Sequence, residues 1–238
     1  LLDNITDIRS DSMVREIDRD LYDQDGIILD QIGASAAGQL PKGFDPSSLY
    51  PARQHPKALQ MTIFGMGDAL GQLGVDWKII QEKIAPDEIA VFSGAAIGQL
   101  DGFGFGGLMQ SRSKGSRASS KNLALGLVEM SADFINAYIL GSVGRTGHVV
   151  GACATFLYNL QMGKEAIESG SARFVVVGGA EAPITPEIVD GFYAMSALSD
   201  DKRMMEMQAQ HNENLKDGPI QKKACRPFGQ NVGMVLGE

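Results

Sequence analysis

Three short apolar runs, each followed by a helical pattern, limit the folds that this chain can adopt more than any other feature. They are "EIAVFSG" at 88–94, "HVVGACA" at 148–154 and "ARFVVVGGAE" at 172–181. Continuous apolar runs rich in β-branched residues are typical of parallel strands that are buried on both faces. Strands that alternate with helices along the chain are typical of helices packed on a mainly parallel sheet. We therefore expect an α/β fold.

Three helices are expected next to these strands. Apolar residues recur at helical spacing over 57–73 and again over 121–140. A third helix is expected over 154–169, and Gly170 ends it because glycine adopts the left-handed backbone that follows many helices. Five residues of this third helix are expected to face the sheet: Phe156, Leu157, Leu160, Gly163 and Ile167. The N-terminal stretch 1–56 is rich in Asp, Gly and Pro, which predicts loops.

Composition and charge exclude several classes of protein. The chain contains no apolar run of about 18 residues, so no membrane span is expected. The first residues carry charges throughout, unlike the apolar centre of a signal peptide. The net charge of −8 argues against a general nucleic-acid binder, which is normally basic. Its two cysteines, Cys153 and Cys225, form neither a disulfide framework nor a metal-binding spacing, which favours a reducing cytoplasm and no metal site.

Cys153 lies where the second expected strand meets the third expected helix. A thiol acts as a nucleophile when it is ionised, accessible and close to donors for a developing oxyanion. The unpaired N–H groups at a helix start favour a thiolate, and Gly151, Ala152 and Ala154 leave room for a sharp turn. A lone cysteine beside alanines is more often a small buried hydrophobe. These residues alone leave both interpretations open.

The order of the motifs resembles one family. Small residues surround Cys153, a helix closed by glycine follows, then the strand "VVVGGAE", and then "GFYAMSALS" at 191–199. This order resembles the β-ketoacyl-acyl-carrier-protein synthases, the condensing enzymes of the thiolase superfamily. The resemblance extends from about residue 91 to "RPFGQNVGMVLGE" at 226–238. It implies a thiolase-like layered αβαβα fold. Residues 1–238 are then expected to supply mainly its N-terminal half, as a domain that is incomplete at both ends.

The resemblance implies a decarboxylating Claisen condensation. Cys153 would take an acyl group from a carrier-protein thioester, and the carbanion of a malonyl-carrier thioester would then attack it. The product would be a 3-oxoacyl-acyl carrier protein in fatty-acid, related lipid or polyketide synthesis. A thiolate suits both halves, because it is a good nucleophile and a good leaving group. Phosphopantetheine arrives on the carrier protein, so no cofactor of the chain's own is implied, and a homodimer is usual.

Two alternatives remain open. One is a coenzyme A-dependent thiolase-like enzyme, although the string "GFYAMSALS" favours the carrier-protein synthases. The other is a non-catalytic partner subunit, similar to a chain-length factor, that shapes the acyl tunnel without condensing. Such subunits typically lack the nucleophile, so the presence of Cys153 argues against this second alternative.

Several further positions match the family's motifs. Ile97 and Phe192 match positions that line the acyl tunnel. Glu181 ends the strand "VVVGGAE", where the family keeps a buried carboxylate in a structural network. Acyl carrier proteins are acidic, and the basic segment "SRSKGSRASSK" at 111–121 offers a docking surface for one. The expected docking residues are Arg53, Lys114, Arg117 and Lys121.

Part of the family's machinery has no match in this chain. The family uses two histidines and a lysine in its second half, and a later glycine-rich loop donates to the oxyanion. His55, His148 and His211 do not match these motifs. The similar "GFGFGG" at 102–107 follows an earlier strand, so it is not assigned that role. We therefore expect the chain alone to be inactive. Strand alternation places His148 on the face opposite Cys153, which favours a structural or interface role.

Overall fold

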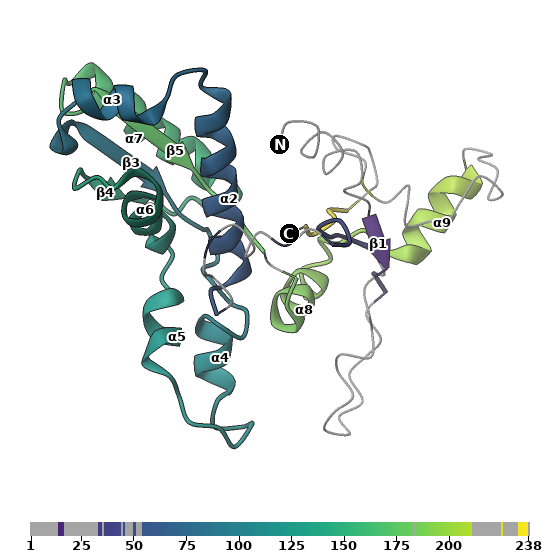
Figure 1. Ribbon diagram of the computed structural model, residues 1–238. Coiled ribbons are helices and arrows are strands. Elements are labelled where there is room, and N and C mark those ends of the chain that lie inside the picture. Colours follow the sequence, from purple (N-terminus) through teal and green to yellow (C-terminus); the bar gives the residue numbers. More distant parts are fainter. Residues whose placement is uncertain are drawn as a thin grey trace. The chain divides into compact units, whose positions relative to one another are not determined.

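The computed structural model describes two compact units, shown in Figure 1. The sheet unit comprises Asp45–Ala182, and the second unit comprises Leu1–Phe44 with Pro183–Glu238. The sheet unit combines helices with a parallel sheet, which confirms the predicted α/β fold. The described residues of the whole chain are 14–16, 33–34, 36–43, 45, 50, 54–182, 184–210, 225 and 233–237.

The sheet has three parallel strands in the order β4–β3–β5. The central strand β3 (Ile89–Ser93) pairs with β4 (Thr146–Gly147) on one side and with β5 (Phe174–Gly178) on the other. The strands predicted at 88–94 and 172–181 are thus confirmed. All five residues of β3 are buried, as the continuous apolar run in the sequence predicts.

The strand predicted at 148–154 is wrong. The two-residue strand β4 lies immediately before it and ends at Gly147. Beyond that point side chains bond to the backbone: the Val149 N–H donates to Asn159 Oδ1 at 3.1 Å, and the Gly151 N–H donates to Thr155 Oγ1 at 3.0 Å. An N–H that donates to a side chain is not available to a neighbouring strand, so the chain leaves the sheet here.

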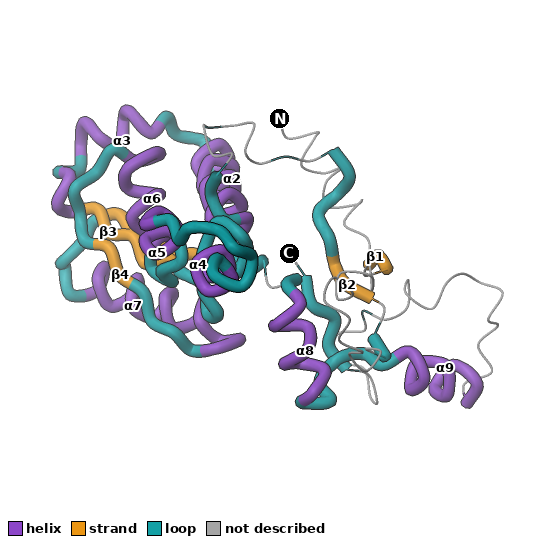
Figure 2. Tube along the Cα trace, turned by 90° about the horizontal axis from the view of Figure 1, so that it is seen from below, coloured by secondary structure: helices purple, strands orange, loops and turns teal. Residues whose placement is uncertain are grey.

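Helices cover both faces of this sheet, as Figure 2 shows. On one face lie α2 (Lys57–Gln72), α6 (Met130–Phe134) and η4 (Ile135–Leu140), and on the other lies α7 (Thr155–Glu168). The helices predicted at 57–73 and 154–169 are thus confirmed. Successive β3 residues point to opposite faces. Ile89 and Val91 join the core under α2, and Ala90 and Phe92 join the core under α7.

The helix predicted at 121–140 is broken into two pieces. The first is α5 (Ser120–Leu125), which ends at Gly126, and the second is α6, which runs without a break into η4. A Cβ added at Gly126 would overlap the ring of Phe105, so this glycine allows a close approach that a continuous helix would prevent. The shorter elements of the unit include α3 (Trp77–Lys83), η3 (Pro86–Glu88), α4 (Phe105–Gln110) and η5 (Ala152–Ala154).

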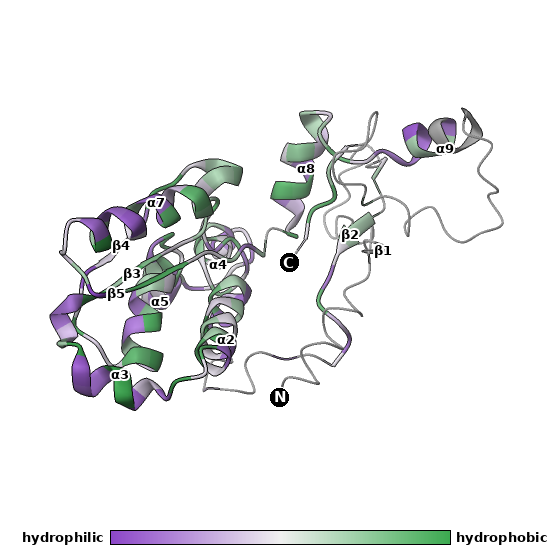
Figure 3. Cartoon of the chain, turned by 90° about the horizontal axis from the view of Figure 1, so that it is seen from above, coloured by the Kyte–Doolittle hydropathy of each residue, from purple (hydrophilic) through white to green (hydrophobic). Residues whose placement is uncertain are grey.

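Within its described residues, the second unit contains a two-stranded antiparallel sheet and two helices. Strand β1 (Val14–Glu16) pairs with β2 (Ala36–Gly38), which makes the loops predicted over 1–56 wrong at these two positions. Helix α8 (Pro186–Ala194) packs its apolar side into a small core, whereas α9 (Asp201–Gln210) is largely hydrophilic (Figure 3). The buried members of this core are Ala34, Val189, Leu198 and Leu236. Among the described residues, none of the helices is both long and apolar enough to cross a bilayer.

Candidate active site

Cys153 lies in the 3-10 turn η5 (Ala152–Ala154), directly before α7, and its side chain is exposed. The preceding residue, Ala152, has a φ of 48°. Residues other than glycine rarely adopt this left-handed backbone, and where they do they often mark a functional turn. Here it forms the sharp turn expected at the start of α7. Cys153 is therefore not packed in the core of this chain.

Thr155 braces this turn from inside. Its side chain is buried, and its hydroxyl donates to the Ala152 carbonyl at 2.7 Å and accepts from the Gly151 N–H at 3.0 Å. A Cβ added at Gly151 would overlap the ring of Tyr158, seven residues further along the chain. The backbone on the N-terminal side of Cys153 therefore lies tightly against α7 and has little freedom to move.

Asn159 joins the turn to the sheet. It is 0% exposed, and its Oδ1 accepts from the Val149 N–H at 3.1 Å. Its Nδ2 donates to the carbonyl of Gly178, at the end of β5, and to His148 Nδ1, both at 3.2 Å. The other ring nitrogen of His148 lies 3.0 Å from the Ala95 carbonyl. Because a carbonyl only accepts, the His148 Nε2 carries the proton and Nδ1 accepts.

Glu181 lies at the same edge of the sheet, three residues beyond β5. Its Oε1 accepts from the Ala96 N–H, and its Oε2 is buried without a hydrogen-bond partner in the described part of the chain. Burial raises the pKa of Glu181, and the amides of Ala96 and Ile97 and the nearby His148 partly oppose that rise. Ile97 itself is partly buried. Two of the expected site positions, Ile97 and Glu181, therefore occur in one corner of the sheet unit.

The basic segment lies on the hairpin formed by α4 and α5. Lys114 and Arg117 are exposed in the loop between these helices, and Lys121 is exposed near the start of α5. Lys121 Nζ lies 3.4 Å from Gln54 Oε1, just before α2. Together with the larger effect of burial, the charge of Lys121 lowers the pKa of His55. The segment thus approaches the start of α2. Arg53, the fourth expected docking residue, lies outside the described residues.

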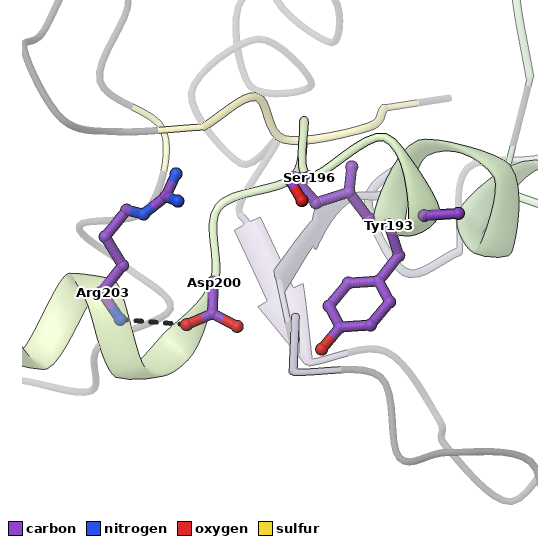
Figure 4. Close-up of a pocket in the computed structure, with 6 residues that line it drawn as sticks. Tyr193, Ser196, Asp200 and Arg203 are labelled. Atoms are coloured by element: carbon purple, nitrogen blue, oxygen red, sulfur yellow. Dashed lines mark hydrogen bonds between the residues drawn. The ribbon is translucent and has the colours of Figure 1, made fainter.

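Phe192, the second expected tunnel residue, belongs to the second unit. It lies in α8, is partly buried and packs against the core that contains Val189 and Leu198. A pocket of about 350 Å³ opens at the turn after α8 (Figure 4). Phe192 is not among the residues that line it. Those lining residues are Tyr193, Ala194, Ser196, Leu198, Asp200 and Arg203.

The face of α7 that packs on the sheet differs from the predicted one. Four of the five predicted residues are 46–62% exposed: Phe156, Leu157, Leu160 and Ile167. Only Gly163 is buried as predicted, and Thr155, Asn159 and Ala166 accompany it. A Cβ added at Gly163 would lie 2.5 Å from Val177 Cγ1 and 3.1 Å from Val175 Cγ1. Close approach of helix and strand therefore requires small residues on this face and turns the large ones away.

Sequence reasoning missed Thr155 and Asn159. Both lie on the buried face of α7, four residues apart, and both bond to the backbone around Cys153. A signal for them was present. Positions 155, 159, 163 and 166 repeat at helical spacing and carry only polar or small residues, whereas the apolar residues lie between them. A polar or small stripe on an otherwise apolar helix indicates a buried polar network in place of ordinary core packing.

Comparison with known proteins agrees with this geometry. The curated β-ketoacyl-[acyl-carrier-protein] synthase FabY of Pseudomonas aeruginosa is 52% identical over 203 residues, which cover 85% of this chain and 31% of that protein. The crystal structure of FabY superimposes with a TM-score of 0.79 over the same shares. A β-ketoacyl synthase from Burkholderia phymatum has the same fold at 20% identity, with a TM-score of 0.70. The match covers 100% of this chain and 53% of that protein's chain.

The chain thus spans about a third of the length of its relative FabY. The model of one family, "Beta-ketoacyl synthase, N-terminal domain", matches residues 3–238. The thiolase-like fold expected from the sequence is confirmed by these structural neighbours. The family match covers Cys153, its turn and the sheet on which α7 packs, and the chain belongs to the β-ketoacyl synthase family through its N-terminal domain.

Proposed function

We propose that Cys153 is the nucleophile of a β-ketoacyl-acyl-carrier-protein synthase. The observation that carries this proposal is the exposed thiol of Cys153, which directly follows the left-handed Ala152 and precedes α7. Ala154, the N-cap of α7, provides no side-chain cap. The Thr155 N–H donates to the Ala152 carbonyl, so negative charge that develops beside the sulfur meets the N–H groups that follow it in the first turn. The 52% identity to FabY supports the same activity.

The first half-reaction is acyl transfer. The Cys153 thiolate attacks the carbonyl carbon of an acyl thioester, so that a new carbon–sulfur bond forms to Sγ. The bond to the phosphopantetheine sulfur of the carrier protein breaks, and that sulfur leaves as a thiolate, which takes up a proton. The turn braced by Thr155 holds the nucleophile in one place throughout. Effective catalysis by an attacking group depends on such fixed placement.

The second half-reaction is condensation. A malonyl-carrier thioester loses carbon dioxide, and the carbanion left behind attacks the acyl carbon on Cys153. A carbon–carbon bond forms, the bond to Sγ breaks, and the thiolate of Cys153 is regenerated. The resemblance assigns the decarboxylation to two histidines that His55, His148 and His211 do not match, and His211 lies outside the described residues. The part that this chain contributes is therefore the acyl transfer.

A condensation assay tests this function. The full-length protein, supplied with an acyl-carrier thioester and malonyl-carrier thioester, should release carbon dioxide and form a 3-oxoacyl-carrier product. Cys153→Ala should abolish formation of that product. Cys225→Ala is the matched control, because Cys225 is the other exposed free thiol, and it should retain full activity. Product formation by the Cys153→Ala variant at the wild-type rate would refute the proposal.

The proposed carrier-docking residues are Arg53, Lys114, Arg117 and Lys121. The three described ones are exposed, and no ion pair with an acidic side chain is found for them within the described residues. Arg117→Glu should slow acylation by the acidic carrier protein and spare acylation by a short free thioester, because charge complementarity acts mainly on the rate of encounter. Lys78→Glu on α3 makes the same charge change elsewhere and should have no such effect. Equal loss with both substrates would refute docking at Arg117.

Several further assignments belong to the same proposal. Ile97 and Phe192 line the acyl tunnel, and Ile97→Phe should shift the preferred acyl group toward shorter chains in a competition assay. Glu181 is a structural carboxylate that ties its own segment to Ala96.

The enzyme uses no cofactor bound to this chain, forms a homodimer and works in the cytoplasm. Light scattering of the purified protein tests the dimer, and a monomer mass would refute it.

A further inference from the structure

We propose that Asn159 is a positioning residue for Cys153. Its carboxamide fastens the segment that carries the nucleophile to the ends of β3 and β5. The inference rests on the proposed function, because it assigns Asn159 a part in the acyl transfer to Cys153. The resemblance that suggests the nucleophile assigns nothing to Asn159, whose contacts alone indicate this role.

Asn159 belongs to the helix that directly follows the turn with Cys153. It lies on α7, on the same buried face as Thr155, since residues four apart share a face of a helix. Thr155 bonds to the two residues before Cys153, and Asn159 bonds to Val149 two residues further back. The two side chains therefore follow the same approach segment, from Val149 to Ala152. Asn159 is fully buried, so water does not substitute for any of its bonds.

The hydrogen-bond partners of Asn159 determine the orientation of its carboxamide. An asparagine side chain offers one oxygen acceptor and two N–H donors. The oxygen accepts from the Val149 N–H, and the nitrogen donates to the Gly178 carbonyl and to His148 Nδ1. A flipped amide would direct its nitrogen at the Val149 N–H and its oxygen at the Gly178 carbonyl. Both pairs would then repel, so one orientation is strongly preferred.

His148 connects Asn159 to the residues just beyond β3. Its ring lies over Gly94, where an added Cβ would overlap the ring atoms. Through Nε2 it donates to the Ala95 carbonyl, just beyond β3, and through Nδ1 it accepts from Asn159. His148 thus extends the tie from α7 to the end of β3. This connection gives the histidine a use that the condensation chemistry does not require.

A merely structural role for Asn159 predicts different behaviour. Asn136 on η4 offers a matched comparison, because it is also a buried asparagine of the sheet unit. Its Nδ2 donates to the Gly144 carbonyl at 3.3 Å, and its Oδ1 has no hydrogen-bond partner among the described residues. This bond does not reach the approach segment of Cys153. Loss of Asn136 should lower stability alone, whereas loss of Asn159 should also change the reactivity of Cys153.

Three variants of the full-length protein separate these roles: Asn159→Ala, His148→Phe and Asn136→Ala. For each, peptide mapping gives the rate at which iodoacetamide alkylates Cys153, and acylation by a short free thioester gives kcat and KM. Asn159→Ala should lower kcat for acylation about 10- to 100-fold with little change in KM, because small misplacements of a reacting group have effects of this size. His148→Phe keeps a ring over Gly94 and should show a smaller loss of the same kind. Asn136→Ala should lower only the melting temperature.

The outcomes distinguish this inference from the function on which it rests. If wild-type Cys153 accepts no acyl group, the proposed function fails, whatever the variants do. If wild type is acylated and Asn159→Ala and His148→Phe match Asn136→Ala in kcat and alkylation rate, Asn159 is only structural and the inference is overturned. Should Asn159→Ala fail to fold, His148→Phe alone decides, and an unchanged kcat for that variant overturns the inference equally.

Discussion

The two faces of the same three-stranded sheet are built in different ways. The face under α2 and α6 is an ordinary hydrophobic core of large, fully buried side chains from both the sheet and the helices. The face under α7 is covered by small and polar residues of the helix, which approach the strands closely and bond to their ends. The first face is represented by Ile63 and Met66 of α2 and by Ile135 and Leu140 of η4. The second is represented by Thr155, Asn159, Gly163 and Ala166 of α7.

This difference indicates that one face mainly supplies stability and the other mainly fixes geometry. Burial of large apolar groups supplies most of the free energy of folding, but it tolerates small shifts in position. Hydrogen bonds and close backbone contacts contribute less net stability, and they specify geometry more strictly. Cys153 lies at the start of the helix with the second kind of contact. Changes on the α2 face should therefore alter stability, and changes on the α7 face should alter acyl transfer as well.

The largest expected effect on stability is on the α2 face. Ile135 is 2% exposed in that core, and Ile135→Ala should lower the free energy of unfolding by about 2–5 kcal/mol, through lost burial and a residual cavity. Denaturant titration measures this loss. At a temperature where the variant stays folded, kcat for acylation of Cys153 should equal that of wild type. A tenfold lower kcat in the folded variant would remove the distinction between the two faces.

A smaller loss of stability, with an effect on chemistry, is expected at Gly163. The Cβ of Gly163→Ala would collide with Val177 and Val175, and overpacking of this kind costs about 1–3 kcal/mol. Because the collision pushes α7 from the sheet, acylation should slow as well.

Gly67→Ala on α2 is the matched control for this change. An added Cβ at Gly67 meets nothing within 4 Å, so the variant should gain up to about 1 kcal/mol from helix propensity alone. Chemical unfolding and acylation kinetics compare the two variants. Equal stability of both would contradict the close packing of α7.

A loss of about 1 kcal/mol is expected at the start of α2. This helix begins after Pro56, which provides no side-chain cap, and Asp101 supplies the missing acceptor to the Lys57 N–H at 2.7 Å. Asp101→Ala should lower the free energy of unfolding, whereas Asp101→Asn keeps an oxygen acceptor and should lose less. Acylation of Cys153 by a free thioester should stay unchanged in both. An identical loss in the two variants would show that Asp101 does not act as the cap.

The smallest expected effect is on the pH dependence of stability. Burial raises the pKa of Glu181 above its ordinary value of 4.5, so between these two values the folded state binds more protons than the unfolded state. Stability should therefore fall as the pH rises through this window. Glu181→Gln cannot titrate and should remove that decline while it retains an acceptor for the Ala96 N–H. Unfolding curves across the window test this, and parallel profiles for the two proteins would contradict it.

The sequence patterns predicted the fold best where local signals and packing agree. Strands β3 and β5 are continuous apolar runs, and α2 and α7 each end near a glycine, so their bounds were predicted closely. The helix at 121–140 could not be predicted as two pieces, because the break at Gly126 depends on the distant ring of Phe105. The sheet formed by β1 and β2 joins segments that carry no apolar alternation.

The candidate site was predicted in part. The turn at Cys153 was expected from small residues before a helix, whereas its role as a nucleophile came from the family resemblance and stays a prediction, with which its exposure agrees. Apart from Gly163, the inward face of α7 was predicted wrongly, because apolar periodicity points to Leu157 and Leu160, whereas close packing selects small and polar residues. Thr155 and Asn159 were missed because the prediction followed the apolar residues and not the polar and small stripe, and most of their partners are backbone groups. Long-range contacts of this kind become visible only in three dimensions.

The central claim, that Cys153 forms the acyl-enzyme, is tested most directly by the mass of one peptide. The full-length protein is incubated with an acyl-carrier thioester without the malonyl substrate, digested and analysed by mass spectrometry. The account predicts that the peptide containing Cys153 gains the mass of the acyl group and that the peptide containing Cys225 does not. An unmodified Cys153 peptide from folded protein with a competent carrier, or an acyl group found only on Cys225, would contradict it.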